Sequence, residues 1–293
     1  MIRLVTLICF LQVFTAFGQT ETLIEEQQKL IGEFSGAIEW EGTTLNARSS
    51  SEERDLARDY LKDRIRSLGL EPKENTYLMP NLNPLIDLLF SPFKGANIYT
   101  VLPATVESDE YVVLGAHFDT EVGCPGAIDN GTGVALIYSV VKKLQLVQNR
   151  SKNIMLVFFD QEEEELVGSQ AFAKFLNKQQ WKIHSVHTFD MVGWDADGDR
   201  EMELELPTPE LENAYYGVAS RLEIPLYVTS INSTDHHSFR QVGFPAIGVN
   251  EAYGKRDSSP FKDTPEDTFD TVNFDYLAGS TLFVFEVMKE IMK

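Results

Sequence analysis

The amino-acid sequence predicts a single α/β domain with a mainly parallel sheet. Three observations support this prediction. Apolar segments of strand length alternate with segments of helical periodicity from about residue 97 onward. Residues 110–117 are apolar on both faces, as in a strand whose sheet is covered by helices on both sides. The 293 residues contain no internal repeat and no low-complexity linker, which favours one large domain over two.

The first 18 residues have the composition of a secretory signal peptide. Arg3 precedes a long apolar stretch, and the small residues Ala16 and Gly18 stand before Gln19. We therefore expect cleavage after Gly18, a mature domain of residues 19–293, and export to the periplasm or the extracellular space. An uncleaved anchor is the alternative, but the apolar stretch is short for a membrane span. No membrane span is expected in the mature chain.

Charge and cysteine content narrow the classes of partner. The net charge of −20 repels phosphate backbones and anionic lipids, so nucleic acid and anionic membrane surfaces are not expected as partners. After cleavage Cys124 is the single cysteine, which rules out an internal disulfide in the mature chain. Cys124 lies between Gly123 and Pro125, a setting that favours loop packing over a catalytic thiol.

The predicted elements follow one another along the chain. Residues 51–54 begin an amphipathic helix that ends at Gly69. Residues 76–96 contain three prolines and form either an excursion packed on the domain or a hydrophobic flap over a site. Beyond them, we expect strands at 97–102, 110–117, 153–160, 184–191 and 244–250, and helices at 131–147, 168–178 and 274–292.

Acidic residues and a histidine stand at or near the ends of three of these strands and in a glycine-rich loop. They are His117, Asp119, Asp129, Glu162, Glu163 and Asp190. In α/β sheets the reactive groups gather at the carboxyl ends of strands, so we expect these side chains to meet. Carboxylates packed together without a cation would repel and raise one another's pKa. Imidazole and carboxylate are ligands of zinc, so the pattern predicts a metal site, and two metals account for so many acids better than one.

Several ordered motifs resemble those of the M28 family of zinc aminopeptidases. They are His117-Phe118-Asp119, residues 126–133 around Asp129, Glu162-Glu163 with Gly168-Ser169, residues 189–193 around Asp190, Asp235-His236, and residues 264–268. The similarity extends from about residue 96 to the C-terminus. It implies a zinc-exopeptidase-like fold, with an eight-stranded mixed sheet flanked by helices, and a co-catalytic pair of zinc ions.

The resemblance also implies a metal-binding role for several residues. His117 and Asp190 would hold one zinc ion, and Asp129 would bridge both ions, often with a strained peptide to the next residue. Glu163 would hold the second ion. In the family the last ligand is a histidine, but this sequence has Asp263 at that position. Asp is an acceptable zinc ligand, so we expect Asp263 to complete the second site.

Two alternatives to Asp263 stay open. The second site could be empty or weak, which would leave one metal, or His236 or His237 could take the place of the missing ligand. By the same resemblance, Asp235 and His236 would line the site without binding metal. They would contact either the metal ligands or the substrate.

The resemblance divides the work of the paired glutamates. Glu162 would be the general base that takes a proton from water and gives it to the leaving amine. Asp119 would orient His117, as carboxylates commonly do for metal-bound imidazoles. The following acids, Glu164 and Glu165, have no role in the family pattern and are expected at the surface.

The function that follows is that of a secreted metallo-aminopeptidase, which hydrolyses the N-terminal residue of peptides with a free amine. One alternative is a single-zinc acyltransferase similar to glutaminyl cyclases, which this chain resembles at residues 158–163 and at Asp235-His236. Another is a catalytically silent homologue that binds peptides or metal, for which Asp263 is the sole support.

Overall fold

The computed structural model describes residues 20–80 and 92–293. The predicted signal peptide lies outside the described residues, as does most of the predicted excursion. Of that excursion, residues 76–79 belong to a first strand and residues 93–96 to a second. Within residues 20–80 and 92–293, no helix combines the length and the apolar character that crossing a membrane requires.

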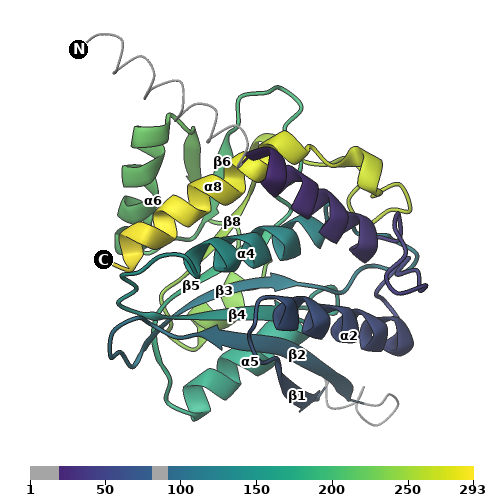
Figure 1. Ribbon diagram of the computed structural model, residues 1–293, viewed down its shortest axis with the longest axis horizontal. Coiled ribbons are helices and arrows are strands. Elements are labelled where there is room, and N and C mark those ends of the chain that lie inside the picture. Colours follow the sequence, from purple (N-terminus) through teal and green to yellow (C-terminus); the bar gives the residue numbers. More distant parts are fainter. Residues whose placement is uncertain (1–19, 81–91) are drawn as a thin grey trace.

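Eight strands form one mixed sheet, in the order β1-β2-β4-β3-β5-β8-β6-β7 (Figure 1). Their bounds are β1 (Lys73–Met79), β2 (Phe93–Leu102), β3 (Glu110–His117), β4 (Asn153–Phe159), β5 (Lys182–Asp190), β6 (Met202–Glu205), β7 (Leu226–Thr229) and β8 (Ala246–Glu251). The four central strands β4, β3, β5 and β8 are parallel to one another. Antiparallel pairs join β2 to β4, β1 to β2 and β6 to β8. The predicted fold class is confirmed.

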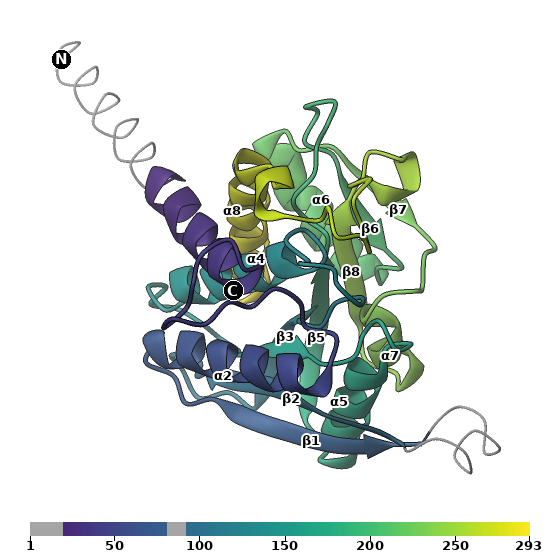
Figure 2. The same ribbon diagram turned by 90° about the vertical axis from the view of Figure 1, so that its right-hand side faces the viewer.

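Helices cover both faces of the sheet. They are α2 (Ser51–Ser67), α4 (Gly131–Leu144), α5 (Val167–Lys178), α6 (Pro209–Leu222), α7 (His236–Gln241) and α8 (Phe274–Ile291), and residues 20–34 are also helical. One face carries α4, with α8 packed against both α4 and α6 (Figure 1). The other face carries α5 and α7, which pack against each other (Figure 2).

The central strands separate two apolar clusters because successive side chains of a strand point to opposite faces. In β3, Val112 and Leu114 belong to the cluster under α4 and α8, whereas Val113 belongs to the cluster under α5 and α7. All three side chains are fully buried. This two-sided burial explains why β3 and β4 are apolar along nearly their whole length.

The predicted helix at 51–69 is confirmed as α2, and the expected strands and helices of the later chain match β2 to β5, β8, α4, α5 and α8 within a few residues. Ser50 and Glu53 form a capping box at the start of α2, which fixes where that helix begins. The elements between residues 201 and 243 were not predicted. The strands there, β6 and β7, have four residues each, too few to show a periodic pattern.

Candidate metal centre

The predicted residues come together at the carboxyl edge of the parallel strands. His117 is the last residue of β3, and Asp190 is the last residue of β5. Glu162 and Glu163 follow the end of β4, and Asp129 lies in the loop before α4. Because β3, β4 and β5 are parallel neighbours, their ends deliver these side chains to one place.

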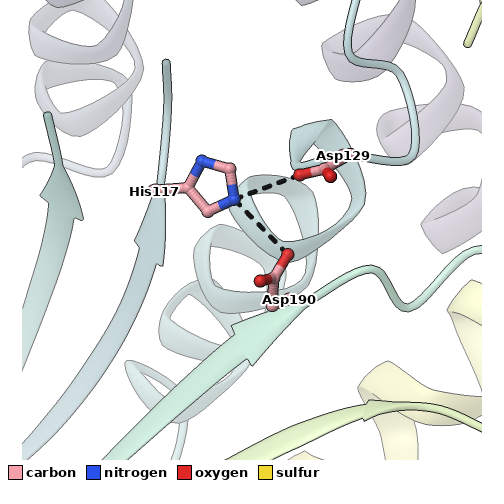
Figure 3. A group of neighbouring side chains, drawn as sticks. All are labelled: His117, Asp129 and Asp190. Carbon is pink, nitrogen blue, oxygen red and sulfur yellow. Dashed lines mark hydrogen bonds and ion pairs between the residues drawn. The ribbon is translucent and has the colours of Figure 1, made fainter. Parts of the chain in front are cut away.

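His117, Asp129 and Asp190 form the first group of possible metal ligands. His117 Nε2 lies 3.1 Å from Asp129 Oδ1 and 3.4 Å from Asp190 Oδ1 (Figure 3). One ligand atom from each of the three lies within 4.8 Å of the others, which is the spacing a single cation can bridge. All three residues are buried.

Asp129, Glu163 and Asp263 form a second group of the same kind. Asp129 therefore belongs to both groups and stands between them. Asp263 is exposed and has a backbone φ of 60°, a region in which Asp is tolerated better than most residues. Neither His236 nor His237 belongs to any such group among the described residues.

The carboxylates of this centre are close enough together to need a cation between them. Burial and, to a smaller extent, the charge of the neighbouring Asp129 together raise the pKa of Glu163 to about 9. Burial also raises the pKa of Glu162 well above its ordinary value. Within the described part of the chain, the buried Asp129 Oδ1 accepts no hydrogen bond of normal geometry, although His117 Nε2 lies 3.1 Å from it. A donor set of one imidazole and several carboxylates, with an unsatisfied buried oxygen at its middle, fits zinc.

Asp267 positions Asp129 through the backbone. The amides of Ile128 and Asp129 each donate a 2.9 Å hydrogen bond to the Asp267 carboxylate. The peptide between Asp129 and Asn130 is cis. The Asn130 side chain donates to the Phe189 carbonyl at 2.8 Å and so ties this loop to the end of β5.

Asp119 contacts both His117 and the paired glutamates. Its Oδ1 lies 3.6 Å from His117 Nδ1, beyond hydrogen-bond distance but beside the ring nitrogen that an orienting carboxylate contacts. Its carboxylate also accepts hydrogen bonds from the amides of Glu162, at 2.9 Å, and Glu163, at 3.2 Å. Asp119 thus links the end of β3 to the turn after β4.

A buried carboxylate and two arginines of α2 hold the start of the turn after β4 in place. This cluster was not predicted from the sequence. Asp160 is fully buried and lies 2.8 Å from Arg54 Nε and 3.0 Å from Arg58 Nη1, both on α2. The Ala96 amide also donates to Asp160 at 3.1 Å. The one signal in the sequence was a carboxylate directly after a buried apolar strand, and its partners lie about 100 residues earlier, so local pattern could not identify them.

We expect Gly168→Ala to destabilise the fold through this turn. A Cβ at position 168 would overlap the carbonyl oxygen of Asp160 and would lie 2.7 Å from Asn97 Oδ1. The loss in unfolding free energy should be about 2–3 kcal/mol. Gly217→Ala is the matched control, because Gly217 lies in α6 with open space around it, and Ala should stabilise that helix by about 0.5–1 kcal/mol. Urea unfolding monitored by circular dichroism measures both; equal stabilities would contradict the steric argument.

Asp235 and His236 lie beside the centre and not in the ligand groups. His236 Nδ1 is 2.8 Å from Thr234 Oγ1 and 3.3 Å from the buried Glu205. Burial raises the pKa of Asp235 to about 7. Glu205 also accepts a 3.0 Å hydrogen bond from Asn250, so it links β6 to β8. Glu205 was not singled out from the sequence, because an acid in a four-residue strand gives no pattern.

A cavity of about 590 Å³ borders the centre on the side of Asp263. Its lining includes Tyr253, Arg256, Ser258, Lys262 and Asp263. It is open to solvent, and it meets the second ligand group at Asp263.

Comparison with known proteins shows which family this chain resembles. The model of peptidase family M28 matches residues 97–288. Aminopeptidase YwaD of Bacillus subtilis is 28% identical over 205 residues, which cover 65% of this chain and 44% of that protein. The chain spans about half or less of the length of the first curated relatives it matches.

Solved structures share the fold. A zinc aminopeptidase from Bacillus subtilis superposes with a TM-score of 0.79 and 15% identity, over 92% of this chain and 95% of that one. A glutaminyl cyclase from Porphyromonas gingivalis superposes with a TM-score of 0.75 and 18% identity, over 92% and 98%. At such identities the likeness shows the fold alone. The family match covers well over half of the chain, and the chain therefore belongs to peptidase family M28.

Proposed function

We propose that this protein is an exported metallo-aminopeptidase that removes the N-terminal residue of peptides with the help of two zinc ions. The observation that carries the proposal is Asp129, whose carboxylate belongs to two adjacent ligand groups. A shared carboxylate between two such groups is the arrangement of a two-metal hydrolase. The family membership and the similarity to aminopeptidase YwaD support the choice of peptide as substrate.

The chain's own residues divide the work. His117 and Asp190 would hold one zinc ion, Glu163 and Asp263 would hold the other, and Asp129 would be a ligand in both sites. When bound, zinc supplies Lewis acidity, which polarises the scissile carbonyl and lowers the pKa of a nearby water toward neutrality.

Glu162 is the general base. It lies in a group with His117 and Glu163, yet Glu163 and not Glu162 belongs to the group around Asp129 and Asp263. Glu162 takes a proton from the attacking water and gives it to the leaving amine. Asp119 holds the Glu162 amide and so keeps this side chain in place.

The test is hydrolysis of short peptides by purified residues 19–293 loaded with zinc, followed by mass spectrometry. We expect release of the N-terminal residue from a free-amine peptide and no cleavage of its N-acetylated counterpart. Conversion of an N-terminal Gln peptide to pyroglutamate, without hydrolysis of the first peptide, would instead establish the cyclase-like alternative. Binding of zinc with no turnover of any peptide would leave a silent homologue.

Export is part of the proposal and has its own test. If the signal peptide is cleaved as the sequence predicts, the mature protein recovered from the periplasm or the medium starts at Gln19. N-terminal sequencing of the protein from a cell fractionation decides this, and an intact N-terminus in the membrane fraction would show an anchor.

We expect zinc binding to release protons and to weaken as the pH falls. Glu163 has a pKa of about 9 in the metal-free protein, so at pH 7 it is mostly protonated, whereas a zinc ligand must be deprotonated. Apparent zinc affinity should therefore rise with pH up to about 9, tenfold per unit for each proton released. Calorimetry at pH 7 in two buffers of different ionisation enthalpy measures the release, and equal heats in both buffers would contradict it.

A further inference from the structure

Lys262 is a cation placed at the edge of a strongly anionic centre. Five carboxylates supply atoms to the three adjoining ligand groups, two of which contain His117: Asp129, Asp190, Glu162, Glu163 and Asp263. Among the described residues, Lys262 is the one Lys or Arg within ion-pair distance of any of the five. Its Nζ lies 3.7 Å from Asp129 Oδ2. The Asp129 carboxylate is shared by the group with His117 and Asp190 and the group with Glu163 and Asp263.

The position of Lys262 is defined by its surroundings. Its ammonium lies 5.9 Å from the centre of the Tyr253 ring, and its side chain is 38% exposed. Burial alone would lower the pKa of Lys262, but the charges of Asp129 and Asp190 outweigh that effect and raise the pKa above its ordinary value. The ammonium therefore stays charged in the presence of these acids.

Charge counting shows what this cation does. Two divalent ions would neutralise four of the five ligand-group carboxylates and leave one negative charge on these groups. A single ammonium balances that charge. Without it, the excess negative charge would hold cations more tightly and would make a nearby water less acidic.

We propose that Lys262 is the counter-charge of the metal centre: it limits how tightly the metal ions are held and keeps the centre neutral enough to activate water. Lys262 is thus a positioning and charge-balancing residue, and it contacts the shared carboxylate without replacing a ligand. The inference rests on the proposed two-metal site, and its central measurement needs no peptide substrate.

The first experiment is a zinc titration of the metal-free protein in competition with a chelator. Lys262→Met should bind zinc about ten- to a hundredfold more tightly than the wild type, because a positive charge 3.7 Å from the shared Asp129 carboxylate is removed. Lys262→Arg keeps the charge and should retain wild-type affinity. Lys255→Met is the matched control, since Lys255 lies in the same segment but pairs with Glu201, and its zinc affinity should not change.

A charge-conserving double variant sharpens the test. Asp263→His removes one negative charge and keeps a zinc ligand, so Asp263→His combined with Lys262→Met has the same charge balance as the wild type. Its zinc affinity should return close to the wild-type value. Turnover of a free-amine peptide should fall in Lys262→Met while zinc binding tightens, a split that a merely structural role would not produce.

The outcomes separate this inference from the proposed function. Unchanged or weaker zinc binding in Lys262→Met would overturn the inference, whatever the activity. If zinc binding tightens as described but the wild type hydrolyses no peptide, the inference stands and the aminopeptidase function is wrong. Thermal unfolding of the metal-free variants checks that each is folded before the titration.

Discussion

Glu162→Gln should keep both zinc ions and lose about 10²- to 10⁴-fold in turnover, the usual worth of a general acid–base group. The substitution preserves the size of the side chain and removes the group that accepts the proton. In the proposed assignment Glu162 is not a ligand, so metal content should not change. Elemental analysis and initial rates on a free-amine peptide, measured on the same preparation, provide the two numbers.

Glu164→Gln is the matched control for this experiment. Glu164 is exposed, lies two residues further along the same turn, and belongs to none of the ligand groups among the described residues. Its turnover should stay within about twofold of the wild type, as for an ordinary surface substitution. Retention of most activity in Glu162→Gln would show that another group takes the proton, and loss of one zinc ion would make Glu162 a ligand.

Asp263→Ala should reduce the zinc content from two ions per chain to about one. Asp263 contributes the most exposed of the three donors in its group, and without it the second ion keeps two protein ligands, Asp129 and Glu163. Turnover should fall when the second ion is lost, because the proposed mechanism uses two zinc ions and Asp129 would then bind only one. Elemental analysis after dialysis measures the change.

Two further variants make the Asp263 result specific. Asp263→Asn tolerates the same backbone conformation and removes the charge, so a loss of zinc in this variant cannot come from backbone strain. Glu266→Gln changes an exposed acid three residues away and should keep two ions. One zinc ion in both the wild type and Asp263→Ala would establish a single-metal site, and two in both would remove Asp263 from the ligand set.

The sequence predicts the central part of this fold well because strands that are buried on both faces appear in the sequence as continuous apolar runs. β3 and β4 are apolar on both faces, and their ends are marked by the first charged or polar residues after the apolar run, His117 and Asp160. Those ends are also where the candidate site lies. The prediction of site position therefore followed from the prediction of the strands.

What the sequence could not predict depends on contacts between distant segments. Arg54 and Arg58 appear as charges on the polar face of an amphipathic helix, yet they meet Asp160 in the interior. In the sequence Lys262 has the features of a surface lysine, yet its Nζ lies 3.7 Å from Asp129 Oδ2. The sharing of Asp129 between two ligand groups was expected from the family resemblance alone, because no spacing along the chain encodes it.

The contact between α2 and Asp160 has a consequence for where the working unit of this protein begins. The family model starts at residue 97, but the two guanidinium groups that neutralise Asp160 come from residues 54 and 58. A truncated chain that starts at residue 97 would leave a carboxylate buried without its partners, directly beneath the turn that carries Glu162. The segment before the region that the family model matches is thus an inseparable part of the scaffold of the metal centre, and any minimal fragment or domain fusion has to include it.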